Sequence, residues 1–143
     1  MSTAFTSIPA MALTGKAENF TESEAREYLK ANGLDIEEYP KMLHSAMKTD
    51  GRARACMFKS IITNQSVDEV ETLKNVKIPV LLLGGQEDAF VNYDYVKEIQ
   101  WSSLVETQII EREDHSFVWN NSKLFNTLMM KHLSKNHTNQ ATI

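Results

Sequence analysis

Two residues whose types suit acid–base chemistry, Asp88 and His115, each follow a short apolar segment of the sequence. Apolar runs of this length indicate buried strands, and polar side chains that follow parallel strands gather at one edge of a sheet. A carboxylate bonded to one ring N–H of an imidazole fixes its tautomer, so that the other nitrogen can act as a general base. In chain order, Asp and His match the last two members of a Ser…Asp…His arrangement.

The first member of that arrangement, a nucleophile, is missing from these 143 residues, which contain no G-x-S-x-G motif. Cys56 is predicted to lie on the apolar face of a helix, where a structural role is the common one. Ser116 adjoins His115 and cannot be oriented toward it as an attacking group. Because acyl transfer through a serine ester needs a nucleophile within reach of its base, the sequence predicts an acid and a base without the attacking group.

The elements that must position the pair lie in the second half of the chain. Residues 78–83 are almost continuously apolar, which predicts a strand covered on both faces, and residues 107–110 predict a second strand. A helix or turn is expected over 92–100, and an apolar stripe predicts a helix from Ser122. This strand–helix–strand–helix order favours parallel pairing with a right-handed crossover. The predicted fold class is therefore α/β.

The first half of the chain is predicted to be helical. Thr21 and Glu24 have the spacing of a capping box, and Gly33 is well placed just after the end of that helix. A second helix is expected over 36–47, with Pro40 tolerated in its first turn.

A third predicted helix begins after Asp50, and a fourth is expected to open on a capping box between Ser66 and Glu69. Helical spacing places one set of side chains of the third helix on a buried face and another on the solvated face. The buried set is Ala53, Cys56, Met57, Ser60 and Ile61; the solvated set is Arg52, Arg54 and Lys59.

Three segments of the second half resemble the α/β-hydrolase superfamily. Residues 80–91, Val-Leu-Leu-Leu-Gly-Gly-Gln-Glu-Asp-Ala-Phe-Val, resemble its seventh strand and acid loop. Residues 109–117, Ile-Ile-Glu-Arg-Glu-Asp-His-Ser-Phe, resemble its eighth strand and histidine loop, and 124–133 resemble its closing helix. The helical first half, including 20–25 and 49–55, is similar to the cap region that some members insert. The resemblance covers nearly the whole chain but only the C-terminal half of the superfamily fold.

The resemblance implies site residues as well as a fold. Asp88 would be the triad acid and His115 the triad base, and no cofactor is implied. The superfamily histidine usually follows a small residue, whereas here Asp114 precedes it, which leaves open whether Asp88 or Asp114 pairs with the imidazole. Phe90 and Phe117 would flank the site and, together with Trp119, are the candidates for a substrate pocket, with core filling as their alternative role.

The predicted organisation has three parts: a helical cap-like segment over 1–75, hydrolase-type core elements over 76–135, and a polar tail over 136–143. The net charge of −4 gives no electrostatic reason to expect nucleic acid or an anionic membrane as a partner. No signal peptide or transmembrane segment is predicted, and a single cysteine fits a reducing compartment, so the expected location is cytoplasmic. No histidine pair has metal-ligand spacing.

Two strands make a marginal sheet, and an apolar strand such as 78–83 needs neighbours on both sides. The chain is therefore expected to be a truncated product, to pair with a separately encoded N-terminal half, or to self-associate through an exposed sheet edge. The leading hypothesis is a part of a serine hydrolase for ester or related acyl bonds that is inactive alone and meets a small ester-like substrate only when completed. The alternative is a non-enzymatic interaction module built on a fragment of the fold.

Overall fold

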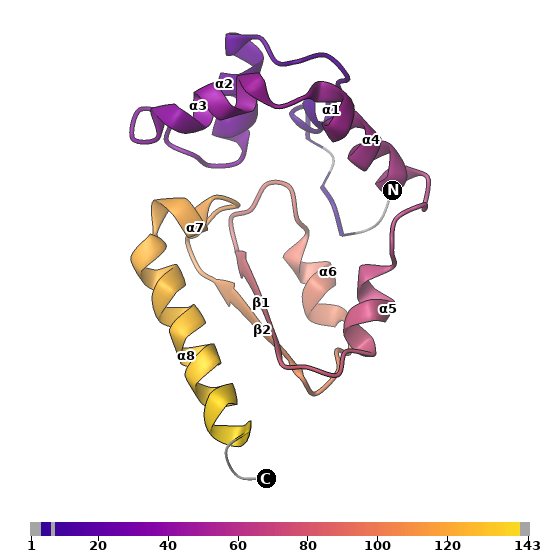
Figure 1. The fold of residues 1–143 in the computed structure, drawn as a ribbon, viewed down its shortest axis with the longest axis vertical. Coiled ribbons are helices and arrows are strands. Elements are labelled where there is room, and N and C mark those ends of the chain that lie inside the picture. Colours follow the sequence, from indigo (N-terminus) through magenta and orange to yellow (C-terminus); the bar gives the residue numbers. More distant parts are fainter. Residues whose placement is uncertain (1–3, 7, 141–143) are drawn as a thin grey trace.

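The computed structural model describes residues 4–6 and 8–140, which form helices around two strands (Figure 1). The elements in chain order are α1 (Met11–Thr14), α2 (Glu22–Ala31), α3 (Pro40–Lys48), α4 (Gly51–Ile62), α5 (Glu69–Lys74), β1 (Val80–Gly85), α6 (Tyr93–Glu98), β2 (Val105–Ile110), α7 (Phe117–Asn120) and α8 (Ser122–Gln140). Figure 1 shows the first four helices lying across the ends of the strands, with α8 on one side of the strands and α5 and α6 on the other.

The two strands pair in parallel, as predicted, with Val80 opposite Val105 and Gly85 opposite Ile110. β1 begins two residues later than expected because Pro79 has no N–H to donate to a ladder, and the preceding Ile78 is 67% exposed. β1 then continues through both glycines that follow the apolar run. The carboxyl ends of the two strands therefore lie side by side, as they must if the residues that follow them are to form an acid–base pair.

Helix α8 is attached to β2 through Glu106. The Glu106 carboxylate lies 3.0 Å from Lys135 Nζ and 3.6 Å from His132 Nδ1, both on α8. The helix runs to Gln140, past the predicted start of the polar tail at residue 136, and residues 141–143 lie outside the described part.

Both ends of α2 are as predicted, whereas α3 begins later than expected. The capping box between Thr21 and Glu24 is present, and Gly33 follows α2 with a φ of 80°. Helix α3 begins only at Pro40, because the Asp35 carboxylate accepts the backbone N–H of Glu37 and holds the preceding residues in a turn.

Helix α5 is capped by Asp68, whose side chain accepts the backbone N–H of Glu71. Ser66 was expected to cap this helix, but it lies two residues too early.

The buried face of α4 differs from the prediction. Arg54 is only 8% exposed, whereas Cys56 is exposed and Met57 is 55% exposed. The Arg54 guanidinium lies 3.7 Å from the centre of the Phe20 ring. Its donors reach three backbone carbonyls, those of Leu13, Lys16 and Glu18. A charged side chain can be buried when its donors are satisfied in this way, so α4 is turned relative to the apolar face that the sequence suggested.

The described N-terminal segment is attached to the loop that follows β1. Phe5 forms an isolated antiparallel bridge with Val91, and the backbone N–H of Thr6 donates to the carbonyl of Phe90 at 2.9 Å. Phe90 also packs in a small buried cluster with Ala10 and Met11. The cap-like segment and the acid loop therefore share a core.

Within the described residues, no helix combines the length and the apolar character that crossing a membrane requires.

Candidate active site

The acid loop places Asp88 by local backbone bonds. The Asp88 Oδ1 atom accepts the N–H of Phe90 at 2.7 Å and the N–H of Val91 at 3.1 Å. Its own N–H donates to the carbonyl of Gly85, which closes the turn out of β1. Aspartate suits such a turn because its short side chain reaches the backbone of the following residues. The other carboxylate oxygen, Oδ2, takes no part in these two bonds and can contact a residue outside the loop.

The acid loop and the histidine loop are held together by their backbones. The N–H of Gln86 donates to the carbonyl of Ile110, and the N–H of Glu87 donates to that of Glu113 at 2.8 Å. Gly85 lies so close to this second loop that a Cβ there would stand 2.3 Å from the Glu113 carbonyl oxygen. Only glycine allows this approach, so the residue that ends β1 also sets the spacing of the two loops.

Asp88 and His115 meet where the two loops come together. The Nδ1 of His115 lies 2.8 Å from Asp88 Oδ2, with the Asp88 side chain 1% exposed and the His115 side chain 44% exposed. Burial alone would raise the pKa of Asp88, but the bonds from His115 and from the Phe90 N–H hold that pKa below its usual value.

The same bond changes the imidazole. The hydrogen bond to Asp88 raises the pKa of His115, against the opposing effect of burial and with help from the charges of Asp88 and Asp114. An ionised Asp88 accepts from Nδ1–H, so the neutral ring carries its proton on Nδ1 and leaves Nε2 free to accept one. This is the geometry of a general base oriented by a buried carboxylate.

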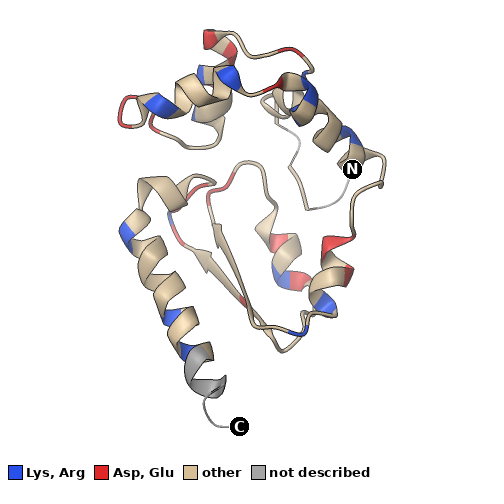
Figure 2. Ribbon diagram, in the orientation of Figure 1, with Lys and Arg blue, Asp and Glu red and all other residues tan. Residues whose placement is uncertain are grey.

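The Asp114 carboxylate forms its hydrogen bonds with groups other than the imidazole. Its Oδ1 accepts the N–H of Ser116 at 2.8 Å, and the carboxylate lies against Gly33, where a Cβ would stand 1.9 Å from Oδ2. Asp114 therefore raises the pKa of His115 through its charge. Figure 2 shows acidic segments at the ends of both strands, close to this site. The structure pairs the imidazole with Asp88.

An apolar cavity of about 190 Å³ opens beside His115. Its wall includes Phe90 from the acid loop, Met11 from α1 and Phe58 from α4. The cavity thus lies between the cap-like segment and the core. The predicted pocket residue Phe90 lines it beside His115.

The other two predicted pocket residues lie elsewhere. Phe117 is buried and packs edge-on against Phe125, with ring centroids 6.0 Å apart. Trp119 is exposed, and its carbonyl accepts the hydroxyl of Tyr39. Neither belongs to the wall of the cavity beside His115. A substrate role for these two residues stays a prediction.

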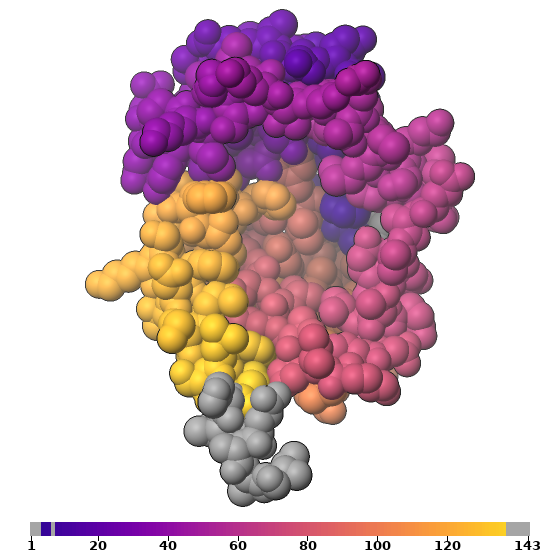
Figure 3. All heavy atoms as spheres, viewed as in Figure 1, coloured from indigo at the N-terminus to yellow at the C-terminus, as the bar shows by residue number. Residues whose placement is uncertain are grey.

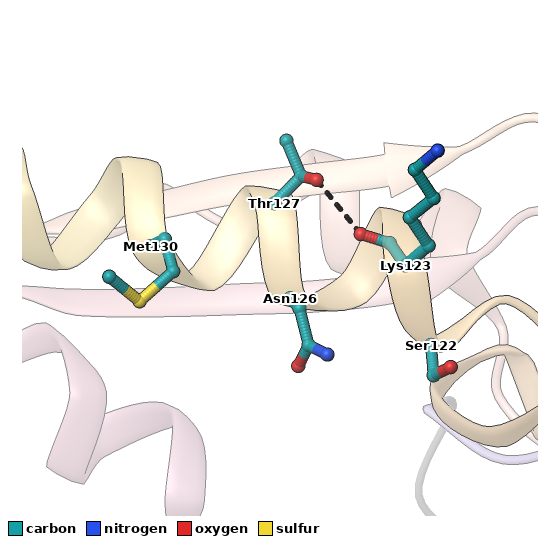
Figure 4. A pocket seen from close by; sticks show the side chains of 5 residues that line it. All are labelled: Ser122, Lys123, Asn126, Thr127 and Met130. Atoms are coloured by element: carbon teal, nitrogen blue, oxygen red, sulfur yellow. Dashed lines mark hydrogen bonds between the residues drawn. The ribbon is translucent and has the colours of Figure 1, made fainter.

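A further depression lies on α8 and is lined by Ser122, Lys123, Asn126, Thr127 and Met130. Figure 4 shows these side chains along one face of the helix, with the Thr127 hydroxyl donating to the carbonyl of Lys123. None of these five residues is a carboxylic acid or a histidine.

Two residues of the site were not anticipated. Tyr93, at the start of α6, interacts with Asp88, and Asn120, at the end of α7, donates to the carbonyl of Gly33 at 2.8 Å. Neither has a distinguishing motif in the sequence, because each acts on a residue brought near it by the fold. In the described part of the chain, no three His, Cys, Asp or Glu side chains are grouped to hold a metal ion.

No protein-family model matches the chain, and neither does any curated protein. Solved structures do match. The N-acyl homoserine lactonase AidH, complexed with N-butanoyl homoserine, matches with a TM-score of 0.79 and 22% identity, over 92% of this chain and 48% of that one. A putative aryl esterase from Burkholderia cenocepacia matches with a TM-score of 0.69 and 14% identity, over 96% of this chain and 52% of that one.

A third match is the 2-hydroxy-6-oxo-6-phenylhexa-2,4-dienoate hydrolase BphD from Rhodococcus sp. strain RHA1. Its TM-score is 0.63 at 17% identity, over 94% of this chain and 51% of that one. The chain spans about half the length of the solved structures that it matches. These likenesses show the fold, which is a partial α/β-hydrolase fold, as the sequence resemblance implied.

Proposed function

We propose that this chain supplies the acid and the base of an α/β-hydrolase-type enzyme that hydrolyses esters or related acyl bonds. The observation that carries the proposal is the 2.8 Å contact between His115 Nδ1 and a buried Asp88 carboxylate at the carboxyl ends of parallel strands. In the proposed reaction, His115 Nε2 takes the proton of an attacking hydroxyl and passes it to the leaving group. Asp88 holds the ring and stabilises the imidazolium that forms.

The proposed nucleophile is a serine on the N-terminal part of the same fold, within one longer polypeptide or on a separate chain. No G-x-S-x-G occurs in these 143 residues, and the matched structures are about twice as long. Because His115 would have no hydroxyl to deprotonate without that part, we propose that the chain is inactive alone.

The proposed substrate is a small ester with an apolar group that enters the cavity beside His115. An apolar protein cavity of about 150 Å³ holds a benzene ring, so about 190 Å³ suits a ring or a short chain of similar size. The polar side chains on the wall are few and include Asn32 and Thr14, which favours an uncharged group. The names of the matched proteins, a lactonase, a putative aryl esterase and a hydrolase, are consistent with a substrate that has an acyl or related bond.

The test is complementation with p-nitrophenyl butyrate as substrate. The chain is assayed alone and mixed with a separately expressed N-terminal half of the matched lactonase, the half in which we propose that the nucleophile lies. We expect hydrolysis only in the mixture, and we expect His115→Ala to abolish it. The exposed His44 on α3 provides the control, since His44→Ala should leave the rate unchanged.

Each result bears on a different part of the proposal. Hydrolysis by the chain alone that disappears in His115→Ala would contradict the proposed inactivity. Hydrolysis by the mixture that survives His115→Ala would contradict the role of His115 as base. A mixture that forms a complex but does not hydrolyse the ester would favour the second candidate function.

The second candidate is an interaction module without catalytic activity. Among the described residues, β1 pairs only with β2, and a cavity of about 720 Å³ lies beside it, lined in part by Leu82, Val70 and Trp101. Nearby Val67 is 70% exposed. An open strand edge next to apolar surface favours association with another chain or a second copy. Light scattering across a range of concentrations checks this: a constant monomer mass would count against self-association.

A further inference from the structure

Asn32, which caps the C-terminal end of α2, lies on the wall of the cavity beside His115 and is 9% exposed. Its Nδ2 donates to the carbonyl of Tyr28, four residues earlier, at 2.7 Å. Because a carbonyl can only accept, the nitrogen of the amide must face Tyr28, and this bond fixes which way the amide is turned. The side-chain oxygen, Oδ1, therefore lies on the side away from that carbonyl.

This oxygen has no partner within the protein. Among the described residues, no group donates a hydrogen bond to Asn32 Oδ1. The oxygen also keeps accessible surface, because the enclosed side-chain atoms that lack a partner in the described part of the chain are Thr107 Oγ1 and His132 Nδ1. A buried polar group costs free energy unless it is hydrogen-bonded. A largely buried amide with an open acceptor on a cavity wall thus indicates a place for a donor that the chain itself does not supply.

The end of the helix does not require this asparagine. The backbone N–H of Asn32 already donates to the same Tyr28 carbonyl at 3.2 Å, and its φ of −78° is one that any residue adopts. Asn75, at the end of α5, makes the same side-chain bond to the carbonyl of Glu71, four residues earlier, but it is exposed to solvent. The two asparagines share a capping bond and differ in what surrounds the rest of the amide.

We propose that Asn32 determines specificity at this cavity, and that its Oδ1 accepts a hydrogen bond from an O–H or N–H on the part of the substrate that enters beside His115. The rest of the wall is mainly apolar and includes Met11, Phe58 and Phe90. A charged donor would lose its hydration against such a wall, so the donor is neutral. The apolar surface binds the body of the group, and one acceptor fixes its orientation, as in other small-molecule sites. This role rests on the proposed function, to which it adds a feature of the substrate.

The test compares phenol with toluene, which has nearly the same size and shape but no donor. The dissociation constants of both are measured by NMR titration of the full chain at pH 5.5. At that pH His115 is mainly protonated, because its pKa lies above 6.5, so its Nε2 cannot accept from phenol. The ratio of the toluene constant to the phenol constant should fall about tenfold in Asn32→Leu, which keeps the size of the side chain and removes the acceptor. Asn75→Leu removes the same capping bond at an exposed site and should leave the ratio unchanged.

Aniline, of similar size, is the N–H probe. A tenfold loss for phenol alone would assign the site to hydroxyl groups, and an equal loss for aniline would assign it to both donors. An unchanged ratio in a folded Asn32→Leu would overturn the proposal, since another polar group of the wall, such as Thr14, would then take the donor.

The unaltered chain decides the question if Asn32→Leu does not fold. Phenol should shift the NMR signals of the Asn32 side-chain amide more than toluene does. Equal shifts, or binding of neither probe, would overturn the proposal. None of these measurements requires hydrolysis. Failure of the complementation assay therefore leaves donor binding by Asn32 standing, and failure here leaves the role of His115 standing.

Discussion

The two loops of the site are held in different ways. In the acid loop, the Asp88 carboxylate is oriented by the loop's own backbone: Asp88 is buried and bonds to the N–H groups of Phe90 and Val91. The histidine loop is more open, and it is held from outside by the cap-like segment. Asn120 donates to the carbonyl of Gly33, which lies between α2 and α3.

This difference shows that the cap-like segment does more than cover the strands. A second bond joins the same parts, from the Tyr39 hydroxyl to the carbonyl of Trp119. Figure 3 shows the first helices seated directly above α7 and the start of α8. The orientation of the Asp88 carboxylate thus comes from backbone groups of its own loop, whereas the segment that follows His115 is joined by side-chain bonds to the cap-like segment.

The largest effect is expected where the two loops touch. In Gly85→Ala, the new Cβ would meet the backbone of Glu113 and Asp114, which cannot move away as a side chain could. We expect a loss of about 3 kcal/mol in the free energy of unfolding, measured by urea denaturation. Gly15→Ala is the comparison, since there the nearest atoms belong to the Phe58 side chain at 3.0 Å. Equal losses in the two variants would show that the loops are not tightly apposed.

The second largest loss of stability is expected in the acid loop. Asp88→Ala leaves the Phe90 and Val91 N–H groups without their acceptor, at a cost of about 2 kcal/mol in the free energy of unfolding. The pKa of His115 should also fall, because the bond that raises it is lost. Asp88→Asn keeps an acceptor oxygen and should destabilise less. NMR titration of His115 and urea denaturation measure the two effects, and an unchanged pKa would exclude Asp88 as its partner.

A smaller loss of stability is expected where the segment after the histidine loop is bonded to the cap-like segment. Asn120→Ala removes the bond to Gly33 and should cost about 1 kcal/mol, while shifting the NMR signals of His115. Asn126→Ala, on the exposed face of α8 drawn in Figure 4, is the matched control and should cost less than about 0.5 kcal/mol. If the His115 signals stay in place in Asn120→Ala, the histidine loop does not depend on the cap-like segment.

The smallest effect is the dependence of stability on pH. The folded pKa of His115 lies above 6.5, so the contribution of the pair is complete below about pH 6.5 and is lost as pH rises through the folded value. The folded pKa of Asp88 lies below 3.8, so its contribution is lost only as pH falls through that lower value. The stability difference between the unaltered chain and His115→Ala should therefore be largest between these limits. Urea denaturation at pH 5.5 and pH 9 checks the sign.

In the complete enzyme that we propose, the catalytic rate should rise with pH, whereas the stability contribution of the pair falls. Nε2 accepts a proton only when the ring is neutral, so the rate should rise with pH through the raised pKa of His115. A rate that falls over this range would count against His115 as the base.

Much of the fold could be predicted from the sequence because the signals are local. The continuous apolar run before Gly84, the Asp50 cap of α4 and the capping box at Thr21 all act within a few residues. The order of strands and helices then left parallel pairing as the favoured arrangement, and that pairing places Asp88 and His115 at the same edge.

Other features depend on residues that are far apart in the chain, and only the tertiary structure decided them. Arg54 is buried because three carbonyls from the α1 region converge on it, although helical spacing placed it in solvent. Asp88 rather than Asp114 meets the imidazole, and the Asp114 carboxylate instead lies against Gly33, in the space that a side chain there would fill. Residue type and spacing thus determined which groups can do chemistry. Which of them touch was decided by close approaches between segments that are distant in the chain, of the Asp114 side chain to Gly33 and of the histidine-loop backbone to Gly85, and no local pattern encodes these approaches.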